Sequence, residues 1–343
     1  MAHIQLRNDR VVGDHLSPYI VAELNTSHFG DLALAKLMID RAKQAGCDCV
    51  KFQSWTTDTL YSAGYYKDNA IAKRFVKKLS LAEAQLKSLS EYCGEIGMDF
   101  ASTPYSRHEA EFLVAHCNVP FLKIASMELD NHPYLAHLAG LGVPLVLSTG
   151  MGSLEEIRAA VDVVTRAGND RLVILHCVSL YPADPEMIRL NNIVGLRSEF
   201  PQCPIGYSDH TLGIEVPVAS VALGACLVEK HFTLDKSRIG MDNQMAAEPD
   251  EMAHMVSACR HVHKAMGGMG RLLDEREVAQ RAKLRRSLVT ARALPAGHVL
   301  RAEDLDAKRP GTGIEPCHID QVIGKTLLVD LAADEAITLG QLG

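Results

Sequence analysis

The sequence predicts an α/β fold, a (β/α)8 TIM barrel followed by a small β-rich domain. Eight short apolar runs recur in the first part of the 343-residue chain, and most precede a segment with apolar residues at helical spacing. The runs are almost continuously apolar, as expected for strands buried on both faces of a parallel sheet. Eight strand–helix units in roughly 250 residues match the size of a closed barrel. An open, doubly wound sheet is the structural alternative, although no GxGxxG motif follows the first run.

The expected strands follow one another at intervals that leave room for a helix. They are residues 19–24, 49–55, 99–104, 121–126, 144–150, 171–178, 204–210 and 226–232. The helical pattern of residues 32–45 stops at Gly46, and glycine is a common helix end. The pattern of residues 81–96 stops in the same way at Gly97. The connection 56–80 is long for a barrel loop, so we interpret it either as a lid over the barrel mouth or as a surface excursion.

The pattern changes after the last expected barrel helix, residues 250–266. A glycine-rich break follows, and then a charged, helix-prone stretch leads to short apolar runs and turns. We therefore expect a barrel over residues 1–270, a linker over 271–286 and the β-rich domain over 287–343. The last of these is too small to bury much of a core.

Composition excludes several classes of protein. The net charge is −7 and no basic run is long enough to follow a nucleic-acid backbone, so no nucleic-acid partner is expected. No apolar run reaches membrane-spanning length, and the first ten residues lack the apolar stretch of a signal peptide. The nine cysteines include no CxxC pair, which is typical of reduced thiols in a protein core. We expect a soluble, cytoplasmic protein.

Two histidines close neighbouring apolar runs. His210 ends the run 204–210, His231 lies at the end of the run 226–232, and a helical segment separates them. A strand, a crossover helix and a parallel strand form a βαβ unit, so both histidines are expected at the same rim of the barrel. Two neutral imidazoles placed in this way can share a divalent metal. The alternative is a pair of buried histidines that donate to backbone carbonyls.

Polar residues gather at the ends of the other expected strands, where a (β/α)8 barrel places its active site. Two lysines and several hydroxyl groups facing one cavity would suit a phosphorylated carboxylate. The alternatives are lysines that pair structurally with a carboxylate, or Lys123 as a Schiff-base residue. The full set is Glu23, Asn25, His28, Lys51, Gln53, Ser102, Thr103, Lys123, Ser126, Glu128, Ser148, Thr149, His176, Ser179, Tyr181, Ser208, Asp209, His210, Lys230 and His231.

Several stretches together resemble the sialic acid synthase family, the N-acetylneuraminate and other nonulosonate synthases. They include VAELNTSHFGD, FLKIASMEL, PLVLSTGM, ILHCVSLYP, IGYSDHTLGIE, VEKHFTLD and, near the carboxyl end, KRPGTG. The resemblance covers almost the whole chain. It implies that the C-terminal module is the family's antifreeze-like SAF domain, a β-clip fold.

The resemblance implies a transferase that condenses phosphoenolpyruvate with an N-acetylated amino-sugar aldose and releases phosphate. The metal, usually manganese with magnesium or cobalt as alternatives, would be held by His210 and His231, with Glu23 and Glu128 as further catalytic residues. The matching phosphoenolpyruvate-binding positions are Lys51, Thr103, Lys123, Ser126, Ser148, Ser179 and Ser208. The matching sugar-binding positions are Gln53, Tyr181, Asp242 and Arg309. The resemblance further implies a domain-swapped homodimer, in which Arg309 reaches into the partner's barrel.

The sequence differs from the family pattern at a few places. Val178-Ser179 stands where some members have an asparagine, and Ile239 to Asn243 replaces a common GPDH string. These differences leave open whether the sugar is N-acetylmannosamine or a 2,4-diacetamido hexose. Two other functions also stay open. One is a 3-deoxy sugar-acid phosphate synthase, which needs a second phosphate site, and the other is a non-catalytic sugar-binding protein on the same fold.

Overall fold

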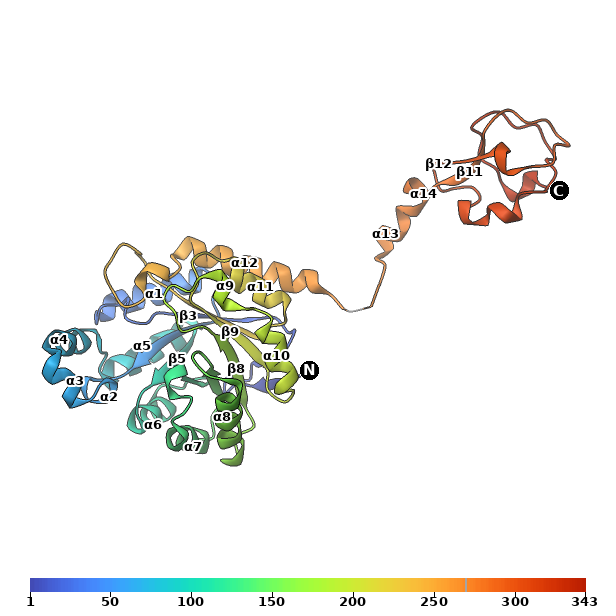
Figure 1. Cartoon of the computed structure of the whole chain (residues 1–343). Coiled ribbons are helices and arrows are strands. Elements are labelled where there is room, and N and C mark those ends of the chain that lie inside the picture. The colour runs from blue at the N-terminus through green and yellow to red at the C-terminus, as the bar shows by residue number, and fades with distance from the viewer. Residues whose placement is uncertain (269) are drawn as a thin grey trace. The chain divides into compact units, whose positions relative to one another are not determined.

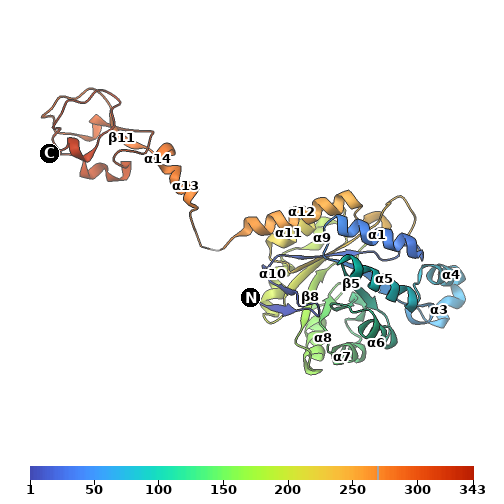
Figure 2. The ribbon, with the colours of Figure 1, turned by 180° about the vertical axis from the view of Figure 1, so that it is seen from behind.

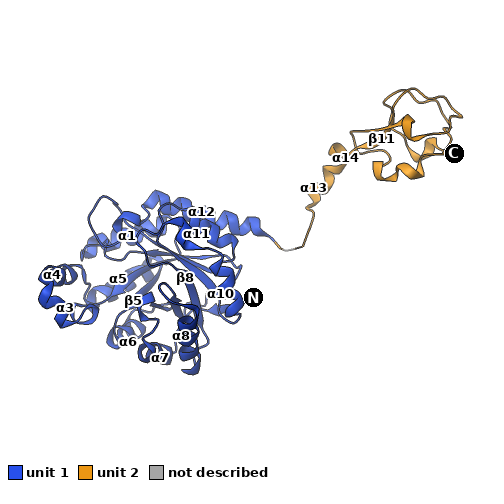
Figure 3. Ribbon diagram, viewed as in Figure 1, with its two compact units in different colours: residues 1–267 blue, residues 268–343 orange. Residues whose placement is uncertain are grey.

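The computed structural model describes residues 1–268 and 270–343. The chain forms two compact units, residues 1–267 and residues 268–343, which are coloured separately in Figure 3. In the part of the chain that is described, no helix has the length and apolar character needed to cross a membrane.

The first unit is a closed barrel of eight parallel strands (Figure 1). Each predicted run contains one of them: β3 (Tyr19–Glu23), β4 (Cys49–Ser54), β5 (Asp99–Pro104), β6 (Leu122–Ile124), β7 (Leu145–Ser148), β8 (Leu172–Cys177), β9 (Ile205–Asp209) and β10 (Leu227–His231). The last strand pairs in parallel with the first, from Leu227 opposite Tyr19 to His231 opposite Glu23. This pairing closes the sheet, so the predicted barrel is confirmed and the open sheet is excluded.

Helices surround the barrel, as the view from behind in Figure 2 also shows. The principal ones are α1 (Leu32–Gln44), α5 (Glu83–Ile96), α6 (Arg107–His116), α7 (His132–Gly140), α8 (Leu154–Arg166), α10 (Asn192–Glu199), α11 (Glu215–Ala222) and α12 (Pro249–Met266). In α1 the buried residues are Ala35, Met38, Ile39 and Ala42, a spacing that lines one helix face. They join the outward-facing strand residues in one large aliphatic core.

Side chains alternate across each barrel strand, and this alternation divides the core in two. Ile20, Val50 and Val228 belong to the outer core under the helices, whereas Tyr19 and Leu227 belong to an inner cluster. The inner cluster also contains three residues of the amino-terminal segment, Ile4, Leu6 and Val12. That segment forms a two-stranded sheet, β1 (His3–Gln5) and β2 (Val11–Gly13), which fills the amino end of the barrel with apolar side chains.

The long connection after β4 folds into three short helices, α2 (Thr57–Leu60), α3 (Ala63–Asp68) and α4 (Ala70–Leu79). Their buried side chains form a separate cluster, in which Val76 and Leu79 pack with Trp55 at the end of β4. Tyr105, which follows β5, packs against the same cluster. The excursion is therefore an ordered element attached to the carboxyl ends of two barrel strands.

The second unit is a small module with an aliphatic core of its own. Its elements are α13 (Glu275–Ala279), α14 (Arg281–Leu284), β11 (Ser287–Thr290), η3 (Ala302–Asp304), β12 (Leu305–Lys308), η4 (Pro316–Gln321) and η5 (Leu339–Gln341). β11 and β12 pair as an antiparallel ladder. The other apolar runs form isolated bridges such as Leu327 with Leu342, so less of this unit is regular strand than the sequence predicts.

The remaining elements of the first unit are η1 (Ser126–Glu128), α9 (Pro185–Ile188) and η2 (Asn243–Met245).

Candidate active site

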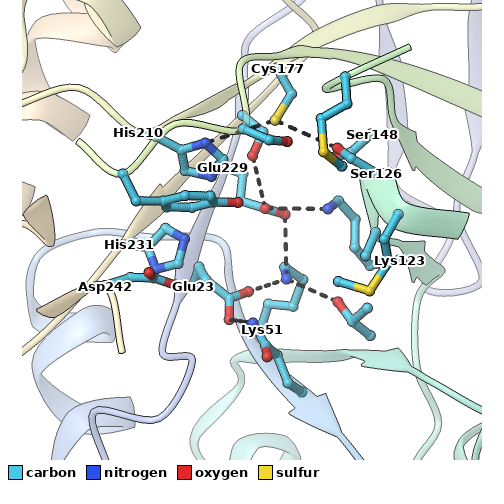
Figure 4. Close-up of a pocket in the computed structure, with 18 of the residues that line it drawn as sticks. Glu23, Lys51, Lys123, Ser126, Ser148, Cys177, His210, Glu229, His231 and Asp242 are labelled. Atoms are coloured by element: carbon cyan, nitrogen blue, oxygen red, sulfur yellow. Dashed lines mark hydrogen bonds and ion pairs between the residues drawn. The ribbon is translucent and has the colours of Figure 1, made fainter. Parts of the chain in front are cut away.

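A cavity of about 240 Å³ lies at the carboxyl ends of the barrel strands (Figure 4). Its wall comes mainly from the inward-facing residues just beyond the apolar inner cluster. The lining residues are Glu23, Lys51, Gln53, Thr103, Tyr105, Lys123, Ala125, Ser126, Met127, Ser148, Met151, Cys177, Ser179, Tyr181, Ser208, His210, Glu229, His231 and Asp242. The structure thus brings together most of the site residues predicted from the sequence.

The two predicted histidines lie side by side at one rim. Lys230 stands opposite Asp209 in the register of β9 and β10, so the next residues, His231 and His210, meet above that pair. Their ring centroids are 5.4 Å apart, and the ring planes are inclined by 58°. Tyr181 covers the pair from one side, with its ring centroid 4.2 Å from that of His210. The spatial prediction for the two imidazoles is confirmed.

The hydrogen bonds of the histidines suit a metal. His210 Nδ1 lies 2.7 Å from the carbonyl oxygen of Val178, which can only accept, so Nδ1 carries the proton and Nε2 keeps a lone pair. Burial holds the pKa of His231 well below its ordinary value, so this ring is neutral. The alternative to a metal site is a pair of buried histidines that donate to backbone carbonyls. His210 makes such a bond, but the described residues provide none for His231. This donor set fits a divalent ion.

Lys51 and Glu23 form an ion pair inside the cavity wall. Lys51 Nζ also lies 3.1 Å from Thr103 Oγ1. Burial raises the pKa of Glu23 above its ordinary value. Burial disfavours the ammonium of Lys51, yet Glu229 and Glu23 outweigh it and raise the pKa of Lys51. Lys51 therefore stays charged, whereas Glu23 takes up a proton more readily than an ordinary carboxylate does.

Glu229 lies between the two lysines. Its Oε1 is 3.4 Å from Lys123 Nζ and accepts a 3.1 Å hydrogen bond from Ser208 Oγ, and its Oε2 is 3.8 Å from Lys51 Nζ. Burial opposes its charge, but Lys123 and Lys51 hold the pKa of Glu229 below its ordinary value. Burial lowers the pKa of Lys123. Two ammonium groups and two carboxylates thus balance one another in a closed space.

Glu229 is not among the site residues predicted from the sequence, although the strand pattern contains a simple signal for it. It lies two residues before His231 on the same strand, and side chains two apart share a face. Placing His231 in the barrel therefore places Glu229 there as well.

Gln53 is held in one orientation by two aromatic residues. Its Oε1 accepts from Trp55 Nε1 at 3.1 Å and from Tyr105 OH at 3.3 Å. The amide nitrogen lies 3.4 Å from Glu23 Oε1 and faces the same cavity. Burial raises the pKa of Tyr105 far above its ordinary range, so the phenol remains a donor. Tyr105 follows β5 in a loop, where the strand pattern alone gave no reason to select it.

Asp242 reaches the cavity from a loop after β10. Its Oδ2 accepts a 2.7 Å hydrogen bond from the side-chain amide of Asn25, whose backbone N–H donates to Glu23 Oε1 at 2.8 Å. Asn25 has a φ of 42°, a left-handed conformation that asparagine tolerates better than most residues. Asn25 thereby links the carboxylates of Glu23 and Asp242, and burial raises the pKa of Asp242.

Hydroxyl groups line the side of the cavity beside Lys123. Ser126 Oγ accepts from the backbone N–H of Gly150 at 3.0 Å. A Cβ atom at Gly150 would lie 2.2 Å from Ser179 Oγ, so only glycine lets the chain approach these serines. Ser148 Oγ is buried and has no hydrogen-bond partner among the described residues. Hydroxyls, a backbone N–H and an ammonium together suit the oxygens of an anion.

Several polar residues at the strand ends do not line the cavity, which corrects the expectation that all such residues point into it. Ser102, for example, has its Oγ 2.7 Å from Ser54 Oγ. His176 Nε2 lies 2.6 Å from the carbonyl oxygen of Ile188, outside the barrel. Asp209 and Lys230 pair with each other at 2.5 Å on the outer face of their strands. The reason is the alternation of the strand, because each directly precedes an inward-facing residue.

Glu128 and Arg309, two residues to which the resemblance assigns roles, also do not line the cavity. Glu128 ends η1, and its Oε2 accepts a 2.7 Å hydrogen bond from Asn131. Arg309 is an exposed residue of the second unit. The predicted roles of both residues therefore stay predictions.

Comparison with known proteins finds similarity over most of the chain. A NeuB family model matches residues 38–271, and a SAF domain model matches residues 285–342. The chain is 40% identical over 334 residues to N,N'-diacetyllegionaminic acid synthase of Legionella pneumophila, covering 94% of this chain and 93% of that protein. It is 35% identical over 343 residues to N-acetylneuraminate-9-phosphate synthase of Homo sapiens, covering 97% and 95%.

Solved structures agree with these matches. The N-acetylneuraminic acid (sialic acid) synthetase of Leptospira borgpetersenii is similar with a TM-score of 0.74 at 32% identity, covering 82% of this chain and 97% of that one. The predicted combination of a barrel and a SAF domain is therefore confirmed.

Proposed function

The chain belongs to the NeuB family, and from this premise we propose that it is a nonulosonic acid synthase, a transferase that condenses phosphoenolpyruvate with an N-acetylated amino-sugar aldose. The named relatives are sugar-acid synthases, so the general class of reaction follows from the family. The observation that carries the finer proposal is the meeting of two lysines and two neighbouring histidines in one cavity.

Phosphoenolpyruvate carries a phosphate and a carboxylate, and the cavity offers one lysine for each. Lys51 and Lys123 now share Glu229, so an entering anion competes with that carboxylate for both ammonium groups. Ser148 Oγ has no partner among the described residues, and Ser126 Oγ, which accepts from the backbone N–H of Gly150, keeps its own hydroxyl hydrogen to donate on the side of Lys123. This arrangement favours a dianionic ligand over a neutral one.

His210 and His231 would hold a divalent metal, and manganese is our choice from the family resemblance. When bound, the metal supplies Lewis-acid polarisation of the aldehyde oxygen. The protein's own part is to present Nε2 of His210, because Nδ1 donates to Val178. Burial keeps His231 neutral and able to act as a ligand.

The proposed reaction forms one carbon–carbon bond and breaks one carbon–oxygen bond. C3 of phosphoenolpyruvate attacks C1 of the open-chain aldose with its π electrons, and the aldehyde oxygen takes up a proton to become a hydroxyl. Water then adds to the electron-poor C2, and phosphate leaves with its bridging oxygen as the C2 ketone forms. Glu23 is suited to accept the proton of that water, because its pKa is raised and its carboxylate faces the cavity.

The cavity favours an aldose without a terminal phosphate. Among the described residues that line it, the only permanently cationic ones are Lys51 and Lys123, and both are paired with carboxylates. A phosphorylated sugar would need a further cationic subsite. Gln53, Tyr105 and Asp242 instead offer neutral donors and a carboxylate, which suit hydroxyl and acetamido groups.

The second unit has a proposed part as well. Arg309 is exposed in the KRPGTG segment, and the SAF match includes it. We place this guanidinium over the partner's barrel in a domain-swapped homodimer, where it would bind the sugar. Replacing Arg309 with alanine should then raise the KM for the sugar without changing the KM for phosphoenolpyruvate.

Phosphate release tests the proposal directly. The purified protein is mixed with phosphoenolpyruvate, Mn²⁺ and a panel of 2-acetamido and 2,4-diacetamido hexoses, each with and without a terminal phosphate. We expect turnover with at least one unphosphorylated sugar of the panel. When the bridging oxygen of phosphoenolpyruvate is isotopically labelled, we expect the label in the released phosphate. Turnover only with the phosphorylated sugars, or unlabelled phosphate, would contradict the proposal.

A further inference from the structure

A buried ion pair lies behind the two histidines, on the outer face of the strands that carry them. Lys230 Nζ is 2.5 Å from Asp209 Oδ2, and the two residues stand opposite each other in the β9–β10 register. Each is 1% exposed, and neither lines the cavity. In the chain each directly precedes one of the histidines, so the sheet itself separates the pair from the imidazoles.

The network around this pair holds the turn that follows β9. Asp209 Oδ1 accepts from Tyr207 OH at 2.8 Å, from Thr211 N at 3.2 Å and from Thr211 Oγ1 at 2.9 Å. Lys230 Nζ also donates to the carbonyl oxygen of Thr211 at 2.9 Å. Asp209 therefore holds the peptide that joins His210 to Thr211, and Lys230 holds the carbonyl of Thr211 from the neighbouring strand.

Stability alone is a poor explanation for two buried charges at this place. Removing an ammonium and a carboxylate from water is costly, and apolar residues of similar size often replace such pairs without loss. Ile205 and Val228 fill other outward positions of the same strands with apolar side chains. The ion pair instead fixes the relative position of two segments, because it joins the end of β10 to the turn after β9.

We propose that Asp209 and Lys230 are positioning residues, which set the separation and inclination of the imidazoles of His210 and His231 and thereby the affinity for the divalent metal. This inference rests on the metal site of the proposed function. It assigns a role to two residues that touch neither substrate nor metal, as hydrogen-bonded groups behind metal ligands often do.

The chain offers a matched control at the opposite end of β9. Asp14 is 2% exposed, lies 3.2 Å from Arg197 Nε, and accepts a 2.9 Å hydrogen bond from the backbone N–H of Ile205. It is also a buried carboxylate that anchors this strand with a cation. Loss of the Asp14 carboxylate should weaken the fold in the same manner. Asp14 lies too far along the strand from His210 and His231 to move their rings.

The test measures Mn²⁺ binding to the metal-free, full-length protein without substrates, by the electron paramagnetic resonance signal of unbound Mn²⁺. The double variant Asp209→Asn/Lys230→Met removes both charges and keeps an amide that can bond Tyr207 and Thr211. We expect its Kd for Mn²⁺ to rise about 10–100-fold. Asp14→Asn should lower the Tm but leave the Kd within about twofold of the parent value.

Each outcome decides the matter. A folded double variant with the parent's Kd would overturn the proposal, and so would an Asp14→Asn variant whose Kd rises as much. If the double variant does not fold, Lys230→Arg, which keeps the charge in a different shape, should raise the Kd by a smaller factor. A parent-like Kd there would equally contradict a positioning role.

One further variant separates this inference from the proposed function. His231→Ala should abolish Mn²⁺ binding in the same assay. If it does not, the proposed metal site itself is wrong, and the positioning role falls with it. If His231→Ala abolishes binding and the double variant leaves it intact, only the positioning role is wrong.

Discussion

The two ends of the barrel differ in chemistry although the same strands build both. At the amino end the inward side chains are apolar, such as Phe121 and Leu227, and the β1–β2 segment adds more apolar groups. Two residues further along the same strands the inward side chains are Lys123 and Glu229. Stability and chemistry are therefore separated along each strand, so substitutions at the two ends should have different effects.

The largest expected effect comes from Lys123. Lys123→Met removes an ammonium that lies 3.4 Å from Glu229 and that we expect to bind the anionic substrate. The rate of phosphate release should fall about 10³-fold, as when a charge-stabilising donor is lost. Steady-state kinetics measures this loss, and circular dichroism should show a folded protein.

Phe121→Ala is the matched change at the amino end of the same strand. It should lower the free energy of unfolding by about 3–5 kcal/mol and leave kcat unchanged in the protein that remains folded. If Lys123→Met and Phe121→Ala each lowered both activity and stability, stability and chemistry would not be separated along the strand.

The next effect concerns Glu23. Glu23→Gln should lower kcat about 10²-fold, because an amide cannot accept the proton of the attacking water. Since burial raises the pKa of Glu23, the rising limb of the pH–rate profile should lie above pH 4.5 and vanish in the variant. Val21 is the preceding inward residue on the same strand. Val21→Ala should lower the free energy of unfolding and keep the rising limb of the pH–rate profile.

The raised pKa of Glu23 also determines whether its contribution to stability rises or falls with pH. A folded-state pKa above the ordinary 4.5 means that the folded protein holds this proton more tightly than the unfolded chain does. The contribution of Glu23 to stability is therefore fully present below pH 4.5 and is lost as the pH rises through the folded-state pKa. Thermal unfolding across that range should show a smaller decline for Glu23→Gln, and a larger decline would contradict the assignment.

A smaller effect is expected at Gly150. In Gly150→Ala the new Cβ would lie 2.2 Å from Ser179 Oγ and 2.9 Å from Ser126 Oγ, so both serines must turn. The KM for phosphoenolpyruvate should rise about tenfold, which corresponds to about 1.4 kcal/mol of lost binding. Gly94→Ala is the control, because a Cβ there meets no atom within 4 Å and should leave the KM unchanged.

The smallest effect tests the excursion after β4. Leu79 packs with Trp55, and Trp55 donates to Gln53, so Leu79→Ala should loosen Gln53. The KM for the sugar should rise about threefold, with no change in the KM for phosphoenolpyruvate. Ile71→Ala on the same helix removes a side chain that is 78% exposed and should change neither. A changed KM for phosphoenolpyruvate alone would argue against this link to the sugar side.

Much of the barrel could be predicted because its strands are continuous apolar runs. All eight runs contain a barrel strand, and His210 and His231 meet as the βαβ argument requires. Side-chain direction is harder to predict than strand position. Asp209 and Lys230 end apolar runs but point outward, whereas Glu229 points inward, and only the alternation of each strand, followed residue by residue, separates the two cases.

Loop residues were the other gap in the prediction. Tyr105 lies after a strand, where no period exists to indicate which side chain turns inward. Its partnership with Gln53 depends on how two segments far apart in the sequence fold together. In the C-terminal module the apolar runs predict strands, but several of these runs pair with their neighbours only through isolated β-bridges.

Anomalous diffraction at the manganese edge, on crystals soaked with Mn²⁺ and phosphoenolpyruvate, would locate the metal and the anion together. We expect one strong peak between the rings of His210 and His231, with the phosphate and carboxylate of the ligand beside Lys51 and Lys123. A peak elsewhere, or a ligand bound outside this cavity, would contradict the proposed active site.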